Sequence, residues 1–258
     1  MGDKNSEPSA TFAKTLSQKN CDVSQAVTEF RKHIHEASAK KPEDVEDAIW
    51  SSWKEYFKVV AMTKPEEQDH LVQFLLQLRK GDGQGKKLKI EETEQTLSNL
   101  PGFGPEMRYV WNDTPNEKSS PELAQAWINF NAFAARITAE SKPDDCMDYS
   151  LYCIWSLRSA LEDAASEEKI TSAILKAAAM WMIYAAREIH QRVVDEQTYD
   201  GRMAIGGRDV DGKEWKGHSK ERWQAWYERF EKRKDGAGDE EMKRVIGEAL
   251  EKMRQVQG

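Results

Sequence analysis

The chain has 258 residues, of which 39% are hydrophobic and 32% are charged, and its formal net charge at pH 7 is −7. The hydrophobic content is enough to build a sizeable buried core. The acidic balance argues against a general attraction to nucleic acid or to an anionic membrane surface, so we expect neither as a partner.

The N-terminal residues and the cysteines bear on where the protein works. Residues 1–20 are polar and mixed in charge, without the apolar stretch of a secretory signal, and we expect them to form a disordered tail. The longest uncharged apolar run, Ala177–Ala186, is ten residues long, about half of what a membrane-spanning helix needs. Three cysteines without a CxxC pair favour free thiols in a reducing compartment. We therefore expect an intracellular protein, in the cytoplasm or the nucleus.

Apolar residues recur at helical spacing through the first 80 residues. Asp22 stands three residues before Gln25, a spacing typical of a capped helix start, and Pro42 and Pro65 mark the starts of two further helices. Residues 81–118 are the least helical part of the sequence because glycine and proline are frequent there. In this part we predict only a short strand near residues 88–90 and irregular structure elsewhere.

Helical periodicity returns at Ser120, a capping residue followed by proline. Pro143 and two aspartates introduce the next predicted helix, and Ser166 begins the longest one, which reaches about Glu196. After an irregular connection, Ser219 caps a helix that holds Trp223. The tryptophans expected in the core of these helices are Trp127, Trp155 and Trp181.

The elements together predict an all-α protein. We expect a single irregular bundle of about eight helices with at most one short hairpin. The helical domain is expected at residues 21–235, and residues 236–258 are expected to form a C-terminal amphipathic helix.

Asp144, Asp145 and Asp148 form a DDxxD pattern, which in class I terpene synthases and prenyltransferases holds Mg²⁺ ions and a substrate diphosphate. Carboxylates at a helix start also cap free N–H groups without any metal. No second metal motif follows in the sequence. We therefore predict no cofactor, with Mg²⁺ as the alternative.

The connection at residues 197–223 is long for a compact helical protein, and such segments are usually functional or disordered. Between residues 201 and 222 it carries six cations and four acids, and it leads to the start of the Ser219 helix, where unpaired N–H groups favour an anion. Alternatively, these cations pair with local acids, and the aromatic residues only anchor the segment. The predicted ligand-binding residues are Tyr199, Arg202, His218, Arg222 and Trp223.

Three segments of the sequence carry a resemblance to a known family. They are Ala177–Trp181, Tyr199–Arg202 and Ser219–Trp223, the last followed by Trp226 and Phe230. With these anchors, residues 145–232 resemble a fungal family of proteins catalogued as a domain of unknown function, DUF3632. The resemblance implies a fungal source and a helical fold, and it brings no established reaction.

We expect the protein to bind an anionic or other small molecule, or a protein partner, through residues 197–223. Two alternatives stay open. One is an enzyme of secondary metabolism, with Mg²⁺-dependent diphosphate chemistry at the DDxxD aspartates. The other is an interaction scaffold without a pocket, which docks through an aromatic loop at Phe103–Trp111.

Overall fold

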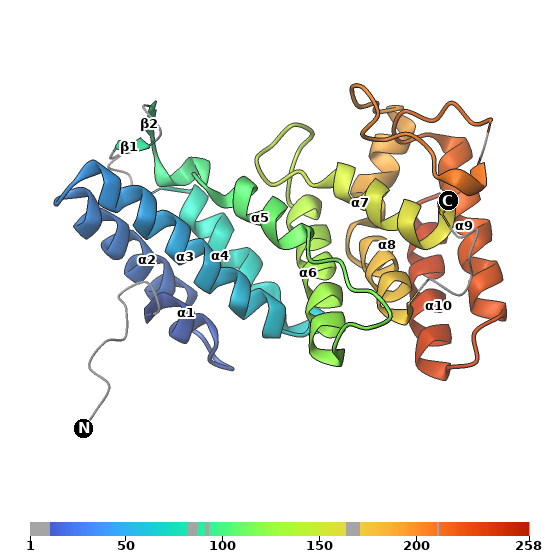
Figure 1. The fold of residues 1–258 in the computed structure, drawn as a ribbon, viewed down its shortest axis with the longest axis horizontal. Helices are drawn as coiled ribbons and strands as arrows, with labels where there is room; N and C mark the ends of the chain where they lie inside the picture. Colours follow the sequence, from blue (N-terminus) through green and yellow to red (C-terminus); the bar gives the residue numbers. More distant parts are fainter. Residues whose placement is uncertain (1–10, 82–86, 91–92, 164–170, 211, 258) are drawn as a thin grey trace. The chain divides into compact units, whose positions relative to one another are not determined.

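Figure 1 shows the fold in a computed structural model, which describes residues 11–81, 87–90, 93–163, 171–210 and 212–257. Over these residues the chain has ten α-helices and one two-stranded antiparallel hairpin, which confirms the all-α fold class. Contacts within the chain divide it into two compact units, Met1–Thr114 and Pro115–Gly258. The sequence led us to expect one helical body instead. Within each unit, the helices pack mainly against other helices of the same unit.

The N-terminal unit is a group of helices around an aromatic core. Trp53 is fully buried, with its ring 5.0 Å from those of Phe30 and Phe103. Its indole N–H donates to the carbonyl of Pro101 at 2.7 Å, so the polar atom of this buried ring is satisfied. The elements of the unit are α1 (Thr11–Leu16), α2 (Val23–Ser38), α3 (Pro42–Met62), η2 (Pro65–Glu67), α4 (Asp69–Arg79), β1 (Leu88–Ile90), β2 (Thr93–Gln95), η3 (Leu97–Asn99) and α5 (Phe103–Trp111).

Several local predictions are confirmed in this unit. The carboxylate of Asp22 accepts from the N–H of Gln25 at 3.0 Å and caps α2, and Pro42 opens α3. The predicted strand is β1, which pairs with β2 in a hairpin. The expected N-terminal tail differs from the structure, since Phe12 of α1 is 1% exposed in the core. Residues 1–10 lie outside the described part of the chain.

The segment Phe103–Trp111 is a helix, so the prediction of an aromatic loop there is wrong. Gly102 precedes it with φ +75°, and a Cβ at this position would stand 3.0 Å from the side chain of Ile49. Proline at position 105 falls in the first turn of the helix, where its missing N–H has no intrahelical acceptor to lose. The glycine and proline therefore start a helix here rather than break one.

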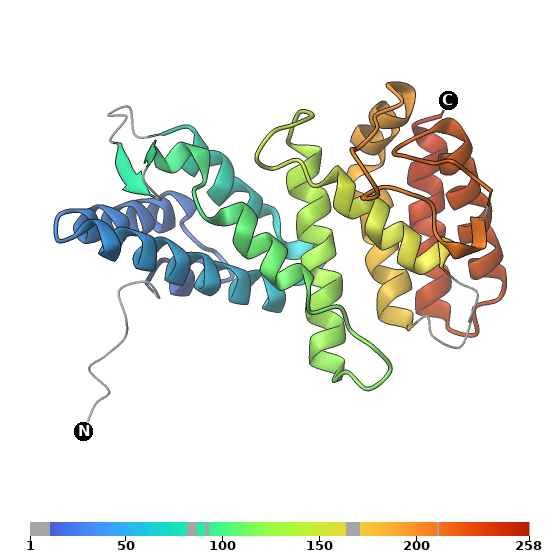
Figure 2. The ribbon, with the colours of Figure 1, turned by 45° about the horizontal axis from the view of Figure 1, so that its top comes forward.

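The C-terminal unit is built around its longest helix, α8, which contacts α6, α7, α9 and α10. Figure 2 shows α8 (yellow to orange) between α6 (green) and α10 (red). Ser120 and Ser219 cap α6 and α9 as predicted. The elements of the unit are α6 (Pro121–Ala139), α7 (Ser150–Leu157), the π-helical turn η4 (Arg158–Glu162), α8 (Ser172–Val194), the 3₁₀ turn η6 (Arg208–Val210), α9 (Lys220–Asp235) and α10 (Glu240–Gln255).

One predicted helix start in this unit differs from the structure, and another lies outside the described residues. Residues 143–149 form turns, and α7 begins only at Ser150. Thr171 caps α8, whereas the predicted start at Ser166 lies outside the described residues. Trp127 and Trp181 are core residues as predicted. Trp155 is half-buried instead, and its indole N–H donates at 2.7 Å to the carbonyl of Met203 in the connection between α8 and α9.

None of the helices in the described part of the chain combines the length and the apolar composition needed to cross a membrane.

Candidate functional site

A buried ion pair joins η4 to α9 in the interior of the C-terminal unit. Nε of Arg222 lies 2.8 Å from one carboxylate oxygen of Glu162, and Nη2 lies 2.9 Å from the other. Both side chains are completely buried. This two-point contact between guanidinium and carboxylate is the geometry in which arginine pairs most strongly.

The remaining polar atoms of this pair are also satisfied. The indole N–H of Trp226 and the backbone N–H of Gly207 donate to Glu162, at 2.6 and 2.9 Å. Nη1 of Arg222 donates to the carbonyls of Ala204 and Gly217, at 2.7 and 3.0 Å. The pair therefore fastens the connection between α8 and α9 to the helices. In this state the guanidinium of Arg222, which the sequence predicts as a ligand-binding group, is fully engaged by the protein.

His218 lies in the same buried region. Its side chain is 1% exposed, and its ring is 6.0 Å from that of Tyr199 and 6.2 Å from that of Trp226. Neither ring nitrogen makes a well-formed hydrogen bond with the described residues. Burial, reinforced by the positive charges of Arg222 and Arg192, lowers the pKa of His218 to about 3. The imidazole is therefore neutral at physiological pH.

The other residues that the sequence predicts for this site are not all gathered together. The phenol of Tyr199 lies 2.7 Å from the hydroxyl of Ser150, and burial raises its pKa. Trp223 is 2% exposed and packs edge-on against His190, with 5.1 Å between the ring centroids. Arg202 is exposed on the connection. The structure thus places Tyr199, His218 and Arg222 in one interior region, and it places Arg202 at the surface.

Two of the three carboxylates of the DDxxD pattern bind protein groups. Asp145 accepts from the N–H of Met147 at 2.9 Å, and Asp144 is exposed with φ +63°. Asp148 accepts from the N–H of Ser150 at 3.0 Å and pairs with Nη2 of Arg192 at 3.1 Å. No group of three or more Asp, Glu, His or Cys side chains in the described ranges is placed to hold a metal ion. The geometry therefore adds no support to the Mg²⁺ alternative.

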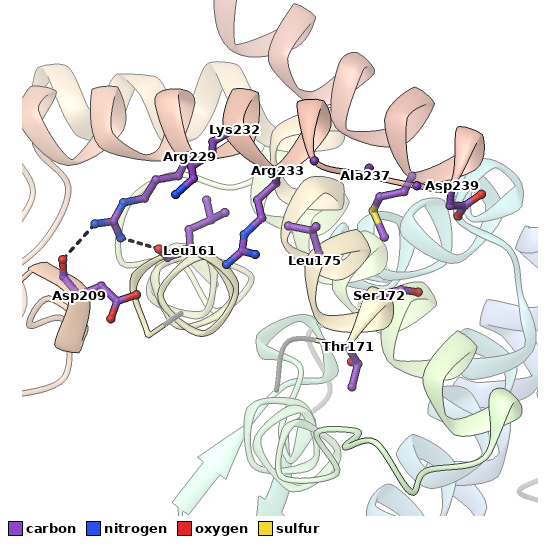
Figure 3. A pocket seen from close by; sticks show the side chains of 13 residues that line it. Leu161, Thr171, Ser172, Leu175, Asp209, Arg229, Lys232, Arg233, Ala237 and Asp239 are labelled. Carbon is purple, nitrogen blue, oxygen red and sulfur yellow. Dashed lines mark hydrogen bonds between the residues drawn. The ribbon is translucent and has the colours of Figure 1, made fainter. Parts of the chain in front are cut away.

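A cavity of about 650 Å³ opens beside these elements, within the same unit. It is bordered by η4, the start of α8, α9 and the turn into α10, and Figure 3 shows it from close by. Arg229, Lys232 and Arg233 of α9 line one side. The lining also includes the apolar side chains of Leu161 and Leu175.

The cations of this cavity differ in their surroundings. The guanidinium of Arg229 donates to the carbonyl of Leu161 and, at 3.2 Å, to that of Asp209 in η6. The ammonium of Lys232 is exposed and makes no ion pair with any described residue. The sequence analysis missed this site, although basic residues three and four positions apart on one helix indicate a shared face. Glu162 was missed as well, since its partner Arg222 is 60 residues further along the chain.

Comparison with known proteins places the chain in a family. The family described as "Protein of unknown function (DUF3632)" matches residues 53–230, more than half of the chain. This match includes Glu162, Arg222 and Arg229, and it ends just before Lys232. No curated protein and no solved structure was found to match the chain. The chain therefore belongs to the DUF3632 family, whose function is unknown.

Proposed function

We propose that the C-terminal unit binds a small anionic ligand in the cavity beside α9. The observation that carries this proposal is the convergence of Arg229, Lys232 and Arg233 on a cavity of about 650 Å³ in a chain whose net charge is −7. Small-molecule sites usually measure about 300–1,000 Å³ and contain a few convergent polar groups. A phosphate or carboxylate group matches the donors of arginine and lysine.

The two acids in the described lining only partly offset this charge. The carboxylate of Asp239 accepts from the N–H of Glu241 at 3.1 Å, so it serves as the cap of α10. Asp209 contributes the second carboxylate, and its backbone carbonyl holds Arg229. The described lining residues therefore carry three cations and two acids, a net charge of +1.

The start of α8 adds a weaker attraction for an anion. Thr171 and Ser172 line the cavity, and the hydroxyl of Thr171 accepts from the N–H of Ile174. The first backbone N–H groups of a helix have no intrahelical acceptor, and the helix dipole is positive at this end. This feature strengthens the proposal without being required by it.

The connection between α8 and α9 has a supporting role in this proposal. Its backbone is fastened by Glu162 and Arg222, and its turn η6 accepts the hydrogen bond that orients Arg229. Residues 197–223, which the sequence predicts as the binding segment, thus contribute Asp209 to the described lining and hold Arg229 in place.

The proposal can be tested by calorimetric titration of the purified protein with inorganic phosphate at low ionic strength. The informative variant is Lys232→Gln with Arg233→Gln. Its matched control, Lys243→Gln with Arg244→Gln, removes the same charge from α10, outside the cavity. We expect at least a tenfold loss of affinity in the cavity variant, because hydrogen bonds to charged groups are worth about 1.5–3 kcal/mol each. The control should bind like the wild type.

Two results would contradict the proposal. The wild-type protein could bind neither phosphate nor an organic phosphate or carboxylate, which would favour a scaffold without a small-molecule site. Alternatively, both double variants could lose affinity equally, which would show that only the net charge of the chain matters.

A further inference from the structure

We infer that the ligand of the cavity is amphipathic, with one phosphate or carboxylate head group on an apolar body. This inference rests on the proposed function and deepens it. Across from the cations of α9, the lining contains Leu161 of η4, Leu175 of α8 and Met242 of α10. Three separate elements thus present apolar side chains to one cavity.

These apolar side chains belong to the core of the unit. Little of their surface is exposed: 2% for Leu161, 7% for Leu175 and 6% for Met242. The cavity therefore borders the hydrophobic core of the unit. Figure 3 shows the side chains of α9 extending toward Leu161 and Leu175. A ligand in this position meets cations on one side and aliphatic carbon on the other.

The size of the cavity argues against a bare inorganic anion as the full ligand. At about 650 Å³ it falls within the range that buries drug-sized molecules, which are much larger than phosphate. Phosphate alone would leave water against the leucine and methionine side chains. An apolar body would displace this water, and each buried methylene should tighten binding about fourfold.

The placement of charge limits the ligand to one anionic group. All three cations of the described lining are on α9, within five consecutive residues, and Leu175 and Met242 lie on other helices. A molecule with an anionic group at both ends would place one of them against the apolar side chains or the carboxylates of Asp209 and Asp239, where a second negative charge is costly. The class is therefore a monoanionic or phosphate-headed molecule with an uncharged aliphatic or aromatic body.

The test is a chain-length series measured by calorimetry on the full protein. The probes are inorganic phosphate and the n-alkyl phosphates from methyl to hexyl, with heptanoate as the carboxylate arm and hexanol as the probe without a charge. We expect affinity to rise with each added methylene until the cavity is filled, and hexanol to bind far more weakly than hexyl phosphate. Comparison of heptanoate with hexyl phosphate identifies the preferred head group.

A variant pair assigns the effect to the apolar wall. Met242→Gln should flatten the dependence on chain length, because it replaces an apolar lining side chain by a polar one of similar size. Met253→Gln is the matched control, since Met253 is buried on the same helix but does not line the cavity. If either variant fails to fold, the wild-type series still decides the question.

The outcomes separate the two proposals. Phosphate binding with no gain along the alkyl series would overturn the amphipathic ligand and leave the anion site standing. The double variant Lys232→Gln with Arg233→Gln could also bind hexyl phosphate as tightly as the wild type. This result would overturn the amphipathic ligand as well, because the ligand would then bind elsewhere. Failure of every anion to bind would remove the proposed function itself.

Discussion

The buried pair of Glu162 and Arg222 predicts a large effect for a substitution that changes shape very little. In Glu162→Gln, one carboxylate oxygen becomes an amide NH₂ group. Either oxygen position accepts from two donors, one of them on Arg222 and the other on Trp226 or Gly207. In the variant, two donors therefore face an NH₂ group instead of an acceptor oxygen. The guanidinium of Arg222 also loses its counter-charge.

The expected cost follows from the complete burial of both side chains. Removal of one partner from a buried ion pair costs about 3–5 kcal/mol, since the remaining charge is uncompensated. Each of the two buried donors left without an acceptor costs about 1–3 kcal/mol, and their sum agrees with the cost of removing one partner of the ion pair. We expect Glu162→Gln to lower the free energy of unfolding of the C-terminal unit by about 4 kcal/mol. This is a large fraction of the 5–15 kcal/mol typical of a domain.

The measurement must report on the C-terminal unit alone, because tryptophans occur in both units. Native-state hydrogen exchange of peptides from α9 meets this need. The control is Glu248→Gln, which removes one partner of an exposed pair with Arg244 and should cost about 0.3–0.5 kcal/mol at most. If Glu162→Gln lowers the free energy of unfolding by less than about 1 kcal/mol, the ion pair is not shielded from water as the structure indicates.

Three further predictions concern the same unit. The pKa of His218 is about 3 in the folded state, below its value of about 6.5 in the unfolded chain. The free energy of unfolding is therefore highest above pH 6.5, and it falls at lower pH because the imidazole binds a proton only in the unfolded chain. Urea titrations should show a loss of about 2 kcal/mol from pH 7.5 to pH 5, and His218→Gln should lack this component. Gly217→Ala should destabilise the unit, because its Cβ would stand 2.0 Å from the carbonyl oxygen of Gln197; an unchanged melting temperature would contradict the packing. Native protein treated with iodoacetamide should be modified at exposed Cys146 but not at Cys153, which is fully buried with a raised pKa. Both cysteines lie on one tryptic peptide, so fragment-ion mass spectrometry of that peptide is needed to locate the modification.

Much of the fold could be predicted because its signals are local. The caps at Asp22, Ser120 and Ser219 each act on a backbone N–H three residues away, so sequence spacing is enough to recognise them. The exceptions arose where turn residues have two uses. Gly102 starts α5 through its left-handed conformation. Asp148 accepts from the N–H of Ser150 at the start of α7 and also binds Arg192 across the unit.

The candidate site was much less visible in the sequence. Arg222 and His218 stood out by composition, yet the structure buries both, since Glu162 supplies a partner for Arg222 from a distant element. The cavity depends on the meeting of η4, α8, α9 and α10, and no pattern within one segment specifies such a meeting. Only the cations at Arg229, Lys232 and Arg233 left a local trace.

The position of a bound anion beside α9 can be determined directly by crystallography. Crystals grown with selenate would reveal its position through the anomalous scattering of selenium. We expect a selenium peak in the cavity, with the selenate oxygens within hydrogen-bonding distance of Lys232 and Arg233. Peaks found only on other surfaces, or an empty cavity at saturating selenate, would contradict it.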